Sequence, residues 1–90
     1  MSISVEQFAD ATMAYNAMVR LGEAGGNASG QPKIAPGVDG IRYQTSFYPP
    51  DGTSDWAFSF AKGSRVVTIK TDQTTSAYAY NVGVSIVSKF

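Results

Sequence analysis

The sequence predicts an α+β fold, in which one N-terminal amphipathic helix packs on one face of a four-stranded antiparallel β-meander (α-β-β-β-β). Residues 5–21 carry apolar side chains at three- and four-residue steps, as one face of a helix does. Residues 41–88 change to a period of two that turn-forming residues interrupt. Ninety residues suffice for one modest core, so we expect a single domain over residues 1–90.

The helix is expected over about residues 5–21. Ser4 and Gln7 have the spacing of a capping box, in which each side chain bonds to the other residue's backbone N–H. Gly22 is a natural stop at the other end. The apolar stripe consists of Val5, Phe8, Thr12, Tyr15 and Val19.

Residues 22–40 form the connector between the helix and the sheet. They are rich in Gly, Pro, Asn and Ala and have no visible period. A phosphate-binding loop would need a lysine followed by Ser or Thr at the start of a helix. Here Lys33 follows Pro32 and no hydroxyl residue follows it. The connector is therefore interpreted as a flexible linker or as a loop that contacts a partner.

Four strands are expected between residues 41 and 88. The first covers 41–48 and ends at Pro49 and Pro50, which cannot donate to a strand ladder. The second and third strands share the stretch 55–71, and the fourth follows another polar turn. The fourth strand is the longest and lies at the edge of the meander. Lys89 is its only charged residue, and charged residues are what commonly keep an edge strand from pairing with another chain.

Three aromatic residues, Trp56, Phe58 and Phe60, lie on one side of the second strand. They could belong to the core, or they could form a stacking platform for nucleic-acid bases. With a two-residue turn at Lys62-Gly63, this row continues into apolar positions of the third strand. The N-terminal helix offers an apolar face of matching width, so we expect the aromatic row to be core.

The opposite face of the sheet carries small, uncharged side chains where a solvated face more often carries charge. Such a face suits close approach by a second sheet or a partner, although a solvated Ser/Thr-rich surface is the alternative. The candidate interface residues are Gln44, Ser46, Ser59, Val66, Thr68, Ala77, Ala79, Asn81, Ser85 and Val87. Self-association through this face or through the last strand would most simply give a dimer.

Composition argues against much chemistry. The chain contains no cysteine and no histidine, which removes thiol catalysis, thiolate metal sites and the commonest general base. The pair Asp51 and Asp55 has the context of turn residues. We therefore expect no enzymatic activity, no cofactor and no metal. No apolar run is long enough to span a membrane and the first residues do not resemble a signal peptide, so an intracellular, cytoplasmic location is expected.

Two classes of function follow. The first is a non-enzymatic protein-binding or self-assembling module, a class that would include a compact inhibitor or a virion-type accessory protein. It would use the small-residue face, the last edge strand and the Gly-rich loop. The alternative is a module that binds single-stranded nucleic acid through Arg42, Lys62, Arg65, Lys70 and sheet aromatics. The net charge of zero is against the alternative, because nucleic-acid-binding domains are usually basic.

Overall fold

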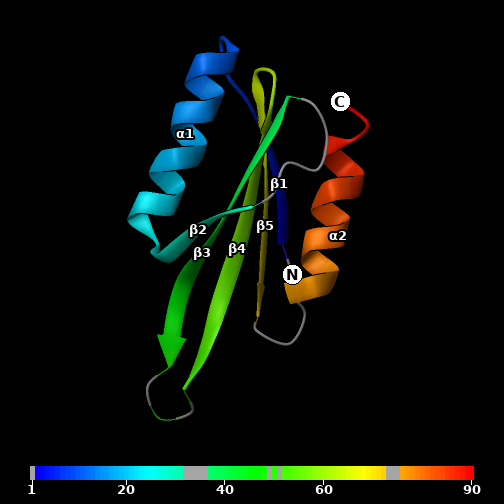
Figure 1. The fold of residues 1–90 in the computed structure, drawn as a ribbon. Coiled ribbons are helices and arrows are strands. Elements are labelled where there is room, and N and C mark those ends of the chain that lie inside the picture. The colour runs from blue at the N-terminus through cyan, green and yellow to red at the C-terminus, as the bar shows by residue number, and fades with distance from the viewer. Residues whose placement is uncertain (1, 32–36, 49, 51, 73–75) are drawn as a thin grey trace.

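The computed structural model describes residues 2–31, 37–48, 50, 52–72 and 76–90, and it has the expected α+β class. In these residues one antiparallel five-stranded sheet lies between two helices, one on each face (Figure 1). The elements are β1 (Ser2–Gln7), α1 (Ala11–Ala24), β2 (Gly26–Gln31), β3 (Val38–Tyr48), β4 (Thr53–Lys62), β5 (Arg65–Asp72) and α2 (Ser76–Val87). The strand order is β1-β5-β4-β3-β2, so β1 and β2 are the outer strands.

The start of the chain differs from the sequence prediction. Residues from position 5 onward are expected to be helical, but Ser2–Gln7 form β1 and pair antiparallel with β5. The helix α1 begins later because Asp10 caps it: the Asp10 carboxylate accepts the backbone N–H of Met13 at 2.8 Å. Ser4, the expected cap, lies inside the strand.

The helix α1 covers one face of the sheet. Its buried stripe is Ala14, Met18 and Gly22, which recur at four-residue steps. Ala61 of β4 packs in the same cluster, with Ile41 of β3 beside it. A Cβ atom on Gly22 would lie only 2.3 Å from the Ile41 side chain. Gly22 is therefore a contact point inside the helix, which continues to Ala24, and not the expected stop.

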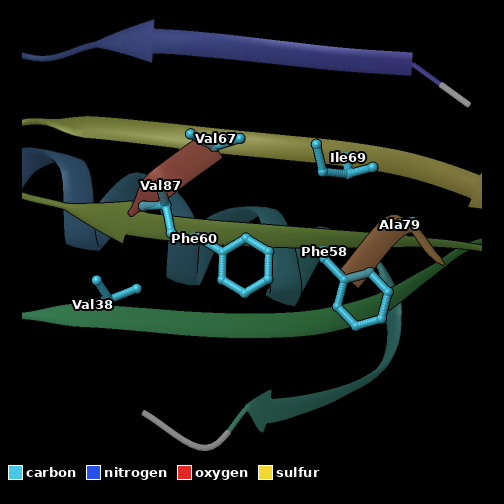
Figure 2. Close-up of a cluster of buried hydrophobic side chains, with 7 residues drawn as sticks. All are labelled: Val38, Phe58, Phe60, Val67, Ile69, Ala79 and Val87. Atoms are coloured by element: carbon cyan, nitrogen blue, oxygen red, sulfur yellow. The ribbon is translucent and has the colours of Figure 1, made fainter. Parts of the chain in front are cut away.

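The larger core cluster lies between the sheet and α2 (Figure 2). It consists of Val38, Phe58, Phe60, Val67, Ile69, Ala79 and Val87. Phe58 and Phe60 are both buried, which confirms that these two aromatic residues belong to the core, and their stacked rings have centroids 6.3 Å apart. Trp56 differs from them: it is half-buried, and the Arg42 guanidinium carbon lies 3.7 Å from its ring centroid.

The hairpin between β4 and β5 is displaced from its expected position. The turn consists of Gly63 and Ser64, with Gly63 at a φ of 57°, and Phe60 pairs with Val67. The expected turn at Lys62-Gly63 would instead pair Phe60 with Arg65, two positions before Val67. Because side chains alternate between faces with a period of two, a displacement of two keeps every residue on its expected face. The aromatic row therefore joins the apolar residues of β5 as expected.

The last element is the main correction to the predicted fold. The segment expected to be the fourth and longest strand is the helix α2. Ala79, Gly83 and Val87 are spaced by four residues and form its buried stripe. A Cβ atom on Gly83 would lie 2.4 Å from the Phe60 ring, so the glycine lets the helix approach the sheet closely. The alternation of tyrosine and valine in this segment resembles a strand, but burial follows the helical stripe.

The connector expected over 22–40 contains more structure than a linker. It holds the end of α1, the strand β2 and the start of β3, and β2 pairs antiparallel with β3. Lys33 and Pro32, on which the phosphate-loop question depends, lie outside the described residues, as do Pro49 and Asp51 of the first expected turn.

Candidate protein-binding site

The candidate interface residues of the sheet mostly contact the protein's own helix. Ser59, Val66 and Thr68 are buried on the face that α1 covers. Gln44 and Ser46 of β3 are half-buried, and the Gln44 side-chain amide donates to the Ser54 hydroxyl at 2.5 Å. The helix α1 therefore packs on the small-residue face. The sequence predicts that this helix covers the aromatic face, which α2 covers instead.

Polar side chains on this face are satisfied internally. The Ser59 hydroxyl lies 3.0 Å from the Tyr43 hydroxyl and 2.9 Å from the Thr68 hydroxyl, so three strands are joined by one buried row. In the described residues no buried side-chain nitrogen or oxygen lacks a hydrogen-bond partner. A buried polar group without a partner would be costly, and this row avoids that cost beneath α1.

The remaining candidate interface residues lie in α2. Ala79 and Val87 are buried against the sheet, whereas Ala77, Asn81 and Ser85 are exposed. Because this segment is a helix, the expected pairing through a last edge strand is wrong. The ten residues do not form one continuous surface.

The cations of the nucleic-acid alternative point to both sides of the sheet. Arg42, Lys62 and Arg65 project on the α2 side, whereas Lys70 pairs with Ala57 and projects on the α1 side. Arg65 is also engaged within the chain, since its Nε donates to the Gln7 side-chain oxygen at 2.8 Å. The four side chains therefore do not line one track for a phosphate backbone.

The two outer strands of the sheet differ in regularity. The pairing of β2 with β3 shifts register between Gly26 and Ser29, and Asn27 has a positive φ of 50°. The pairing of β1 with β5 runs without interruption from Ser2 to Gln7. Bulges and irregular backbone protect sheet edges from further pairing. Of the two edges, β1 is therefore the one suited to receive another strand.

The direction of the backbone groups in β1 follows from one hydrogen bond. The Phe8 N–H donates to the Ser64 carbonyl of the β4–β5 turn at 2.7 Å. In an antiparallel ladder, residues that bond to the neighbouring strand alternate with residues that do not. Continuing this alternation through the β1–β5 register, the N–H and C=O groups of Ile3, Val5 and Gln7 point away from β5 toward the open edge.

Exposed apolar side chains accompany these outward backbone groups. Ile3 pairs with Ile69 and Val5 pairs with Val67, so both side chains lie on the α2 side of the sheet. They are 49% and 53% exposed, although β-branched residues favour burial in a sheet. Glu6 is the single charged residue of β1, and its side chain lies on the opposite side. The edge lacks the lysine or proline that commonly protects an outer strand.

A groove of about 270 Å³ lies on the other side of β1, between β1, β5 and α1. Its walls combine apolar and charged groups. The lining residues are Ser4, Glu6, Phe8, Ala17, Arg20, Leu21, Val66 and Thr68. A strand added beside β1 would place its alternate side chains over this groove and over Ile3 and Val5.

The sequence predicts a helix over most of the residues that form this edge strand. The strand signal was present, because Ser2, Ile3, Ser4 and Val5 alternate polar and β-branched residues. The capping-box spacing of Ser4 and Gln7 fits the same letters equally well. Only the pairing with β5 distinguishes the two interpretations.

Within the described ranges, neither α1 nor α2 combines the length and the hydropathy that a membrane-spanning helix requires. Comparisons with models of known families, with curated proteins and with solved structures found no match to this chain.

Proposed function

We propose that the protein is a non-enzymatic protein-binding module, which accepts an extended segment as an additional strand beside β1. The observation that carries this proposal is the regular, unguarded edge of β1, with the backbone groups of Ile3, Val5 and Gln7 directed outward. In strand addition, main-chain hydrogen bonds supply affinity and pockets for alternate side chains supply specificity.

The two sides of β1 support such a binding mode. One set of side chains on the incoming segment would cover Ile3 and Val5, which are about half exposed. The other set would lie over the groove, where Glu6 and Arg20 offer charges of both signs. We therefore expect ligands with β-branched residues at every second position and polar residues between them.

The non-enzymatic part of the proposal rests on composition. A chain without histidine and cysteine lacks the side chains that most often act as general base, nucleophile or metal ligand. An intracellular location belongs to the same proposal, since a chain without cysteine needs no oxidising compartment to fold.

Selection from a library of short random peptides on the immobilised full chain tests the proposal. We expect the selected peptides to alternate β-branched and polar residues, and to lose binding to the Val5→Pro variant. Proline removes an outward N–H that no described strand uses, so the fold should survive. Val5→Thr keeps both the N–H and the β-branched shape and is the matched control. Peptides that bind Val5→Pro as tightly as the unmodified chain would contradict strand addition at β1.

A further inference from the structure

We propose that the segment which completes the sheet is β1 of a second copy, antiparallel to the first about a two-fold axis beside Ser4. This inference rests on the proposed strand addition and adds the identity of the added strand and its register. It is based on the sequence of β1, the direction of its backbone groups and the irregularity of the opposite edge.

Backbone geometry limits the possible registers. Ile3, Val5 and Gln7 direct their N–H and C=O groups to the open edge, so these residues must face one another across the interface. A two-fold axis beside Ser4 meets this condition, because it places Ile3 opposite Val5 of the second copy. Axes beside Ile3, Val5 or Glu6 meet it as well. Backbone groups alone therefore leave four central registers.

The pairing of side chains distinguishes these registers. With the axis beside Ser4, the exposed Ile3 and Val5 of both copies form one apolar row on the α2 side. Glu6 then lies opposite Ser2, and the two Glu6 positions are separated by roughly 13 Å along the strand. An axis beside Val5 would place Ile3 opposite Gln7, and an axis beside Glu6 would bring the two carboxylates together. An axis beside Ile3 would pair Ile3 with Ile3 but place Val5 opposite position 1, outside β1. The first register alone gives both Ile3 and Val5 an apolar partner within β1 and keeps like charges apart.

The opposite edge explains why assembly would stop at two copies. A two-fold axis perpendicular to the sheet uses β1 of both copies and leaves β2 at each end. The register shift after Gly26 and the positive φ of Asn27 make β2 a poor template for another strand. The product is a closed dimer with one continuous sheet, both α2 helices on one side and both α1 helices on the other.

Disulfide cross-linking of single-cysteine variants tests this register. The chain has no cysteine, so each variant carries one thiol. Beside the axis, the two Ser4 positions form a pair without backbone hydrogen bonds and with Cα atoms about 4.5 Å apart, which a disulfide can join. Ser4→Cys should therefore form a covalent dimer at least about tenfold faster than Glu6→Cys under mild oxidation. Glu6→Cys is the matched control, because Glu6 is exposed and lies on the same side of the same strand.

Each outcome decides a different part of the inference. Faster cross-linking of Val5→Cys than of Ser4→Cys would overturn the register and leave the second copy in place. Equally slow cross-linking of all three variants, with a monomeric mass at every concentration, would overturn the second copy itself. The peptide selection with Val5→Pro would then still decide strand addition on its own, so failure of the dimer and failure of the proposed function are distinguishable.

Discussion

Phe60 and Trp56 lie on the same side of β4 but have different surroundings. Phe60 is fully buried between the Phe58 ring and the Tyr80 ring of α2, whose centroid lies 5.8 Å away. Trp56, four residues earlier in the strand, is half-buried and contacts the Arg42 guanidinium. The sequence shows one aromatic row, but α2 does not bury all of it equally.

Truncation of the two aromatic residues should therefore have unequal effects. We expect Phe60→Ala to lower the free energy of unfolding by about 3–5 kcal/mol, the range for large aromatic side chains in cores. Trp56→Ala should lower the free energy of unfolding by less, because the Trp56 ring is only half-buried and its removal mainly deletes the contact with the Arg42 guanidinium. Urea denaturation of both variants measures the difference. An equal or greater loss for Trp56→Ala would contradict this ranking.

The start of α1 shows how two local signals competed for the same residues. Ser4 and Gln7 have capping-box spacing, yet Asp10 forms the observed cap and β1 pairs with β5. The strands formed by 41–48 and by the hairpin could be predicted, because their alternation is regular and turn residues bound them. The residues of α2 could not, because their alternating tyrosines and valines fit a strand and burial by the sheet decides for a helix.

Removal of the cap tests the observed start of α1. Asp10→Ala should lower the free energy of unfolding by about 0.5–2 kcal/mol, since the Met13 N–H loses its acceptor. Ser4→Ala should change it by less than about 0.5 kcal/mol, because Ser4 is exposed in β1. Thermal or urea denaturation at low protein concentration gives both values. A larger loss of unfolding free energy for Ser4→Ala than for Asp10→Ala would instead support the capping box predicted from the sequence.

The position of α2 depends on the absence of a side chain at Gly83. Alanine there would gain helix propensity of about 1 kcal/mol, but its Cβ would overlap the Phe60 ring. We expect a net loss of about 1–3 kcal/mol, as overpacking in cores causes. Ser85→Ala, on the exposed side of the same helix, is the control and should be nearly neutral. A Gly83→Ala variant that is more stable than the unmodified chain would argue against this close packing.

In the described residues, the molecule as a whole is a sheet with a helix on each face and two edges, of which β1 is the regular one. The sequence predicted the antiparallel sheet, but it assigned the uncharged face of that sheet to a partner when α1 covers it. It also assigned the free edge to the last segment when β1 provides it. Both differences have one physical cause. The face or edge that remains exposed depends on where the two helices pack, and this long-range packing cannot be deduced from the local periodicity of the sequence.

The measurement that tests the open edge most directly is residue-resolved amide hydrogen exchange in β1 at increasing protein concentration. We expect the amides of Ser4 and Glu6, which point to β5, to be protected at every concentration. The amides of Ile3, Val5 and Gln7 should exchange rapidly in dilute solution and become protected as copies pair. Outward amides that stay unprotected at all concentrations would contradict pairing through β1. Equal protection of all five amides in dilute solution would contradict the open edge itself.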